Sequence, residues 1–81
     1  MPEVKAVADA IRLYLARHPQ AADTAEGIQR WWLLPQIGEV SLLVVEAALT
    51  QLEQEGEVRK VQESWTNTAW QRAAAPPSPR H

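Results

Sequence analysis

Hydrophobic residues in positions 3–17 recur every three or four residues, which is the spacing of one face of an α-helix. Pro19 disfavours the helical conformation in the residue before it, so we expect this helix to end at His18. Leu13 falls on the opposite face with Ala6 and Ala10, and the spacing predicts that this face is exposed. The residues predicted to face inward are Val4, Val7, Ala8, Ile11, Tyr14 and Leu15.

A second, shorter helix is predicted to begin at residues 23–26, which read Asp-Thr-Ala-Glu. In this capping box Asp23 would accept a hydrogen bond from the Glu26 amide, and the Glu26 side chain would reach back. Pro35 is expected to end the helix, and residues 36–40 to form a connecting turn. Ala25, Ile28 and Trp32 would face inward, with Trp31 on the flank.

A third helix is predicted from a cap at Ser41 to about Glu55, with Gly56 as its stop. Its inward positions are Val45, Ala48, Leu49 and Leu52. Residues 58–62 and 68–72 are two short segments with β-forming residues, and residues 63–67 suit the loop between them. These two segments predict a β-hairpin.

This order of elements resembles the winged helix-turn-helix superfamily, in which a two-stranded β-wing follows three helices. The resemblance covers residues 3–72, and it is carried by a buried stripe, a glycine and a strand at Val45, Leu49, Leu52, Gly56 and Val58. It implies a mainly α fold with a small antiparallel hairpin, in one α+β domain over residues 1–72. The Pro-rich residues 73–81 are expected to be a disordered tail. The superfamily includes both DNA readers and protein adaptors, so the resemblance leaves the function open.

The amino-acid composition favours a globular protein and excludes cysteine chemistry. Of the 81 residues 46% are hydrophobic and four are Trp, which favours a packed core. Cysteine is absent, so neither a disulfide nor a thiolate zinc site is possible. Charged residues interrupt the N-terminal segment, and the longest apolar run, residues 42–45, is too short to span a bilayer. We therefore expect a cytoplasmic protein that does not engage a membrane.

Residues suited to catalysis are few. His18 and His81 are the only imidazoles, Ser41 is explained by capping, and Glu55 and Glu57 are expected to be solvated charges. No cluster has the spacing of metal ligands, and the three glycines form no phosphate-binding loop. The expected protein is not an enzyme and has no catalytic, metal or cofactor site and no small-molecule substrate.

The outer face of the third helix would meet the major groove if the chain bound DNA as the superfamily can. Residues 39–57 contain five glutamates and no Lys or Arg, and the net charge of the chain is −2. Such a helix would repel phosphates and release no counterions. The alternative hypothesis is a DNA-binding transcriptional regulator that contacts phosphates through Arg30, Arg59, Lys60 and Arg72.

Apolar residues on that outer face favour a protein partner instead. Leu43, Val44 and Ala47 would form an exposed strip, and Trp31 and Trp65 could add aromatic area. Three alternatives remain open: Trp31 could flank the core, Trp65 could cover the sheet, and Leu43 could be buried under the preceding loop. The main hypothesis is a non-catalytic interaction module that binds another protein, or a second copy of itself, through the third helix and the wing.

Overall fold

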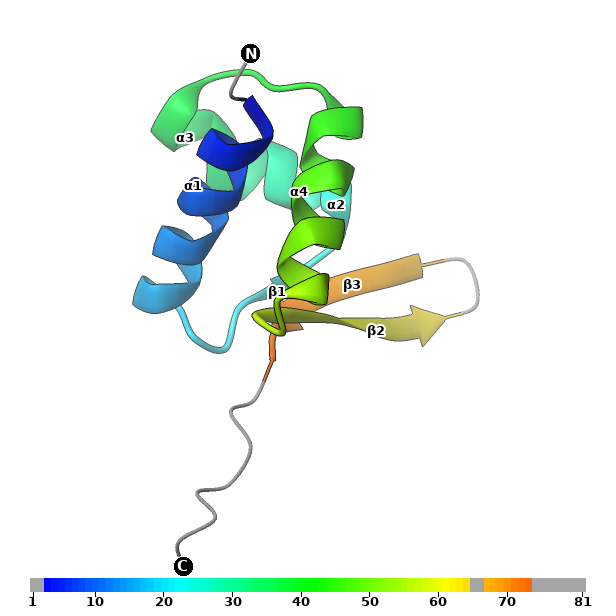
Figure 1. Ribbon diagram of the computed structural model, residues 1–81. Coiled ribbons are helices and arrows are strands. Elements are labelled where there is room, and N and C mark those ends of the chain that lie inside the picture. Colours follow the sequence, from blue (N-terminus) through cyan, green and yellow to red (C-terminus); the bar gives the residue numbers. More distant parts are fainter. Residues whose placement is uncertain (1–2, 65–66, 74–81) are drawn as a thin grey trace, which may run out of the picture.

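Helices and a small antiparallel sheet make up the computed structural model (Figure 1). It describes the backbone of residues 3–64 and 67–73 and the side chains of residues 3–61 and 68–73. Within these residues the chain is mainly helical and carries three strands, so the predicted α+β class is confirmed. Trp65 and the predicted tail beyond Ala73 lie outside the described residues.

Helix α1 spans Glu3–Arg17, which is the predicted range. Val7, Ala8, Ile11 and Leu15 are buried, while Val4 and Tyr14 are half-buried against them. The prediction was wrong at Ala10, which is buried. Gln36 donates a hydrogen bond from Nε2 to the Ala10 carbonyl oxygen at 3.4 Å, so the second helical stretch lies against this side of α1. Leu13 is exposed, as predicted.

The second helical stretch, Ala25–Ile37, runs further than predicted, and we call it helix 25–37. It consists of α2 (Ala25–Gly27), the π-helical segment η1 (Ile28–Leu33) and α3 (Leu34–Ile37). Pro35 therefore does not end the helix. In a regular α-helix its ring would collide with the carbonyl group four residues earlier. The wider π turn just before it, in which the Leu34 N–H bonds to the Gln29 carbonyl oxygen, gives the ring room.

The cap of helix 25–37 lies one residue later than predicted. Thr24 is the N-cap, and its Oγ1 accepts a hydrogen bond from the Gly27 N–H at 3.1 Å. Asp23 is not the cap, because the next residue, Thr24, is still extended at a φ of −72° and a ψ of 167° and the helix begins only at Ala25; the Asp23 backbone pairs with Trp70 in the sheet. Its Oδ1 instead accepts a hydrogen bond from the Thr24 N–H at 2.8 Å.

Helix α4 spans Leu42–Gln54 and agrees with the predicted third helix. Ser41 caps it, with Oγ accepting a hydrogen bond from the Val44 N–H at 3.2 Å. Gly56 follows at a φ of 79°, a left-handed conformation that glycine adopts without strain. The four predicted core residues are all buried: Val45, Ala48, Leu49 and Leu52.

Helix 25–37 and α4 are joined by residues 38–41, and their axes differ in direction by 97°. Gly38 opens this turn at a φ of 83°. In Figure 1 the turn crosses the end of the molecule at which α1 begins. The turn is shorter than predicted because α3 continues to Ile37.

The sheet has three strands, β1 (Ala22–Asp23), β2 (Val58–Ser64) and β3 (Asn67–Arg72), in the order β1-β3-β2. The predicted hairpin is present and its strands are longer than predicted. The sheet was predicted to have only these two strands, but it has a third, because the segment between α1 and α2 adds β1 to the free edge of β3. The pairs Val58↔Arg72 and Lys60↔Trp70 set the hairpin register.

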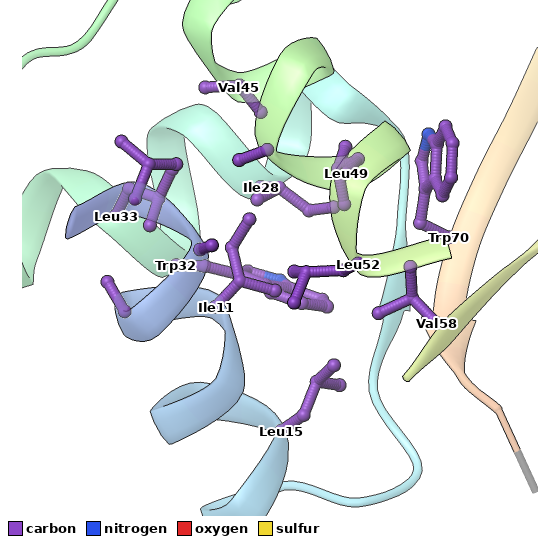
Figure 2. Packing of buried hydrophobic residues seen from close by; sticks show 14 residues of the cluster. Ile11, Leu15, Ile28, Trp32, Leu33, Val45, Leu49, Leu52, Val58 and Trp70 are labelled. Atoms are coloured by element: carbon purple, nitrogen blue, oxygen red, sulfur yellow. The ribbon is translucent and has the colours of Figure 1, made fainter. Parts of the chain in front are cut away.

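One core joins these elements (Figure 2). Trp32 belongs to it, as predicted, and Trp70 of β3 belongs to it as well, whereas burial of Leu33 was not predicted. The Tyr14 ring stacks on Trp32 with a centroid separation of 4.4 Å and an interplanar angle of 10°. The labelled core side chains in Figure 2 are Ile11, Leu15, Ile28, Trp32, Leu33, Val45, Leu49, Leu52, Val58 and Trp70.

Among the described residues, no single helix has the length and apolar character required to cross a membrane. Only the two stretches Ala25–Ile37 and Leu42–Gln54 taken together, bent by 97°, meet that criterion of length and composition.

Candidate functional site

An open groove lies between helix 25–37 and the turn that leads to α4. Its volume is about 720 Å³. Trp31 and Leu34 supply its apolar wall, one helical turn apart on the same face. The full lining is Gln29, Arg30, Trp31, Leu34, Glu39, Val40 and Ser41.

A hydrogen bond fixes the two walls of the groove to each other. Gln29 Nε2 donates to the Val40 carbonyl oxygen at 2.7 Å, across the turn. Both residues are half-buried and Val40 packs against the core, so the turn is tied down. The groove is therefore formed by anchored backbone on both sides.

Trp31 is 69% exposed, whereas its neighbour Trp32 is only 3% exposed. The structure thus resolves the open alternative for Trp31: it lies on the surface. Both residues lie in η1, and π-helical segments in proteins are frequently found at functional sites. Most of the apolar surface of the Trp31 side chain therefore remains in contact with water after folding.

A second, smaller hollow lies on the other side of Trp31. It has a volume of about 190 Å³ and is bounded by α1 and helix 25–37. Leu13 adds exposed apolar surface here, and Arg17 and His18 are exposed beside it. The full lining is Leu13, Tyr14, Arg17, His18, Trp31, Trp32, Pro35 and Gln36. Trp31 therefore stands between two hollows.

The outer face of α4 presents Leu43, which is 79% exposed, and Ala47, which is also exposed. The alternative that Leu43 is buried under the preceding loop is therefore excluded. Val44 departs from the predicted strip: it is half-buried, packs against the core and shares a small hollow with Glu3 of α1. The predicted strip thus reduces to Leu43 and Ala47. Neither residue lines the groove, but Leu43 follows its last lining residue, Ser41, by two positions.

The four candidate phosphate-binding cations do not gather on one face. Successive residues of a strand point to opposite faces, so Arg59 and Lys60 diverge. Lys60 Nζ lies 5.6 Å from the ring centroid of Trp70. The Gln71 side-chain oxygen, turned toward Arg59, accepts hydrogen bonds from Nε and Nη2 at 3.0 Å each. Arg30 lines the groove, and Arg72 lines a hollow between α1 and the sheet.

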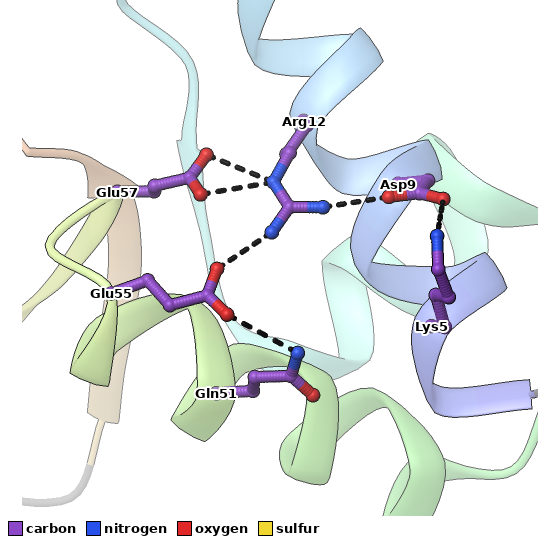
Figure 3. Close-up of polar contacts among 6 residues, drawn as sticks. All are labelled: Lys5, Asp9, Arg12, Gln51, Glu55 and Glu57. Atoms are coloured by element: carbon purple, nitrogen blue, oxygen red, sulfur yellow. Dashed lines mark hydrogen bonds and ion pairs between the residues drawn. The ribbon is translucent and has the colours of Figure 1, made fainter.

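Arg12 of α1 binds three carboxylates (Figure 3). Its Nε donates to both oxygens of Glu57 at 2.9 and 3.0 Å, its Nη2 to Glu55 at 2.6 Å, and its Nη1 to Asp9 at 2.6 Å. The hydrogen bond to Glu57 raises the pKa of Arg12, and the hydrogen bonds from Gln51 and Arg12 lower the pKa of Glu55. Glu55 and Glu57 are exposed, as predicted, but they are not independent solvated charges, because both carboxylates bind an arginine that is distant in sequence.

Sequence reasoning missed Leu34 and Glu39 as parts of a groove. Because the helix was predicted to stop at Pro35, the i,i+3 relation between Trp31 and Leu34 was not read as a shared face. The pair of adjacent tryptophans is the sequence feature that could have indicated an exposed aromatic face. Consecutive side chains of a helix point in different directions, so one of two adjacent tryptophans can pack in the core while the other lies on the surface.

Among the residues that the structure describes, no three His, Cys, Asp or Glu side chains gather closely enough to hold a metal ion. The groove offers instead an indole, a leucine, a guanidinium group and a carboxylate on anchored walls. Such a surface suits non-covalent contact with a polypeptide. No protein-family model, characterised protein or solved structure matches the chain.

Proposed function

We propose that this chain is a non-catalytic protein-binding domain of winged-helix architecture, and that it contacts its partner through Trp31 and Leu43. Two helices at 97°, a glycine-containing turn of residues 38–41 and a following hairpin support the architecture. Helix-turn-helix motifs join their helices at about 90–120° through turns of this length. The short strand β1, between the first two helical stretches, completes a three-stranded sheet with the hairpin.

The observation that carries the proposal is the 69% exposure of Trp31 beside an anchored groove. Burying an indole against a partner removes a large apolar area from water at little loss of side-chain freedom, which is why Trp is enriched among interface hot spots. Leu34 would be covered with it. On α4, Leu43 offers a second apolar contact, since its side chain is the most exposed of the large hydrophobic residues described.

The charges on α4 favour a polypeptide over a nucleic acid. Glu46 and Glu53 lie along the helix that would enter the major groove, and no described residue of α4 is cationic. Arg59 and Lys60 are consecutive residues of β2 and point to opposite faces of the hairpin, so they do not form one cationic surface. Binding of phosphates needs several cations on a common face. Glu55 and Glu57 share the single positive charge of Arg12 with Asp9, so the end of α4 also keeps negative charge.

Site-specific photo-crosslinking in the native host tests this proposal. A photoreactive amino acid is placed at position 31, 34 or 43, and in a matched control at the exposed Ala16 of α1. The expected result is an adduct with a polypeptide from positions 31, 34 and 43 and none from position 16. Crosslinks to nucleic acid alone, or equal yields from all four positions, would contradict the proposal.

A further inference from the structure

We infer that the partner of this surface is a second copy of the same chain, related to the first by a two-fold axis. The inference rests on the proposed function, because it assumes that the surface around Trp31 and Leu43 binds protein. It adds the identity of the partner and the pairing of the residues. The starting observation is that the surface has two neighbouring parts of opposite charge.

The first part, which we call the aromatic bank, consists of Arg30, Trp31 and Leu34 of helix 25–37. It is apolar at its centre and carries an exposed guanidinium group next to the indole. Arginine and tryptophan are the residue types that contribute most often to binding energy at protein interfaces.

The second part, which we call the acidic bank, consists of Glu39 in the turn and Leu43 and Glu46 on α4. Glu46 follows Leu43 by three positions, so the two side chains are neighbours on the helix surface. Both glutamates are exposed. An exposed leucine between carboxylates is the complement of an exposed tryptophan beside an arginine.

None of the charges on these banks forms a salt bridge within 4.0 Å to another described residue. This contrasts with Arg12, whose guanidinium group has carboxylate partners on three residues. Arg30, Glu39 and Glu46 are thus charges that the described fold does not use. Opposite charges at an interface orient the partners and exclude wrong ones.

The acidic bank borders the aromatic bank at Glu39, which lines the same groove as Arg30, Trp31 and Leu34, and a two-fold dimer needs such a shared boundary. The groove has the aromatic bank as one wall and residues 39–41 as the other, and α4 begins at the next residue. When two copies meet face to face about an axis through this boundary, the aromatic bank of each lies on the acidic bank of the other. Every contact then occurs twice, as in any isologous interface. Trp31 would pack against the partner's Leu43, and Arg30 would pair with the partner's Glu46.

Sedimentation equilibrium of the full chain over a wide range of concentrations tests this inference. The wild-type chain is expected to form dimers and no larger species. Arg30→Glu and Glu46→Arg should each weaken the dimer by roughly tenfold or more, because each places like charges together twice. Trp31→Glu should weaken it by roughly a hundredfold or more, since it removes a hot-spot side chain from both halves of the interface. The matched control, Arg59→Glu on the hairpin, should leave the dimer unchanged.

Mixing the two charge-reversal variants provides the decisive observation. In a mixed dimer the glutamate introduced by Arg30→Glu faces the arginine introduced by Glu46→Arg. At the other end of the interface the unchanged Arg30 and Glu46 face each other, so both pairs are of opposite charge again. We expect the mixture to dimerise more tightly than either variant alone. A variant that had merely lost its fold could not be rescued by mixing.

Three results would overturn the inference. The chain could stay monomeric at millimolar concentration, or the dimer dissociation constant could be unchanged by Arg30→Glu and Trp31→Glu. The third result is assemblies that continue to grow with concentration. If the chain is monomeric but position 31 crosslinks to a different protein in the host, the proposed function stands and only the self-association fails. If the chain dimerises through another surface and position 31 gives no adduct, both fail.

Discussion

Two adjacent tryptophans carry opposite roles in this protein. Trp32 is buried and stacks on Tyr14, so it belongs to the core, while Trp31 is exposed and lines a groove. Helical geometry rotates consecutive side chains by about 100°, so one of two neighbouring residues can be packed while the other faces water. The same residue type therefore packs the core at one position and lies on the surface at the next, where we propose that it contacts protein.

Replacing each tryptophan by alanine should separate these roles. Trp32→Ala is expected to lower the free energy of unfolding by about 3–5 kcal/mol, the usual cost of deleting a large buried side chain. Trp31→Ala should change it by about 0.5 kcal/mol or less, because the side chain is largely in water already. Urea unfolding followed by circular dichroism measures both values. Equal losses would show that Trp31 is part of the core.

Ionisation of Glu55 makes the free energy of unfolding depend on pH in the acid range. Its pKa is lowered because Gln51 and then Arg12 donate hydrogen bonds to its ionised form. A group with a depressed folded-state pKa contributes stability above its unfolded pKa and loses that contribution as the pH falls through the folded pKa. Glu55→Gln should therefore lower the unfolding midpoint at neutral pH, and its difference from the wild type should shrink as the pH falls below the ordinary pKa of 4.5 and vanish below the lowered pKa of the folded state. A difference that is the same at neutral and acid pH would contradict this account.

At the scale of elements, local sequence signals predicted most of the fold. The periodicity of α1, the Ser41 cap and Gly56 gave the first and third helices almost to the residue, because each depends on neighbours along the chain. Prediction failed where contacts between residues distant in the sequence determine the local structure. Asp23 looks like a cap, but pairing with Trp70 draws it into β1, and that partner lies 47 positions away.

The candidate site was predicted only in part, for the same reason. Exposure of Leu43 was expected from its place on the third helix, although its burial under the preceding loop remained open until the structure excluded it. The groove was not predictable, because it depends on helix 25–37 continuing past Pro35 and on the hydrogen bond from Gln29 to Val40. The partial burial of Val44 and the ion pair between Glu55 and Arg12 both depend on how α1 lies beside α4. The spacing of residues within one helix does not predict this arrangement.

Gly27 and Asp23 should be energetically coupled at the junction of β1 and α2. A Cβ atom on Gly27 would collide with the Asp23 carboxylate, which itself accepts a hydrogen bond from the Thr24 N–H. Alanine is otherwise better than glycine inside a helix by about 1 kcal/mol. We expect Gly27→Ala to destabilise the wild-type chain but to be neutral or stabilising when Asp23 is also alanine. A double-mutant cycle of unfolding free energies measures this coupling, and strictly additive effects would contradict it.

At the scale of the whole molecule, charge is distributed unevenly. Arg12 ties α1 to the end of α4 and the start of β2 through Glu55 and Glu57, while the exposed glutamates at positions 39 and 46 stay near Leu43. Of the cations on the sheet, Arg59 belongs to one face, and by the strand register Lys60 and Arg72 belong to the other. The surface around α4 thus combines apolar side chains with negative charge.

This distribution predicts that duplex DNA does not bind. Titration of the chain into fluorescently labelled duplex at low ionic strength should give no change in anisotropy, because α4 offers no cation to release phosphate counterions. Arg59→Ala and Lys60→Ala should make no difference to that result. Binding that weakens steeply with salt and with these two substitutions would instead favour the DNA-binding alternative.

Oxidative footprinting of the chain tests the central claim, that Trp31 is kept on the surface for contact with protein. Hydroxyl radicals are applied to dilute purified chain and to the chain at its native abundance in host cells, and oxidised residues are located by tandem mass spectrometry. Trp32 serves as the internal control, because it is buried in both samples. The account predicts that Trp31 is readily oxidised in the dilute chain and protected in cells. Equal oxidation of Trp31 in the two samples would contradict it.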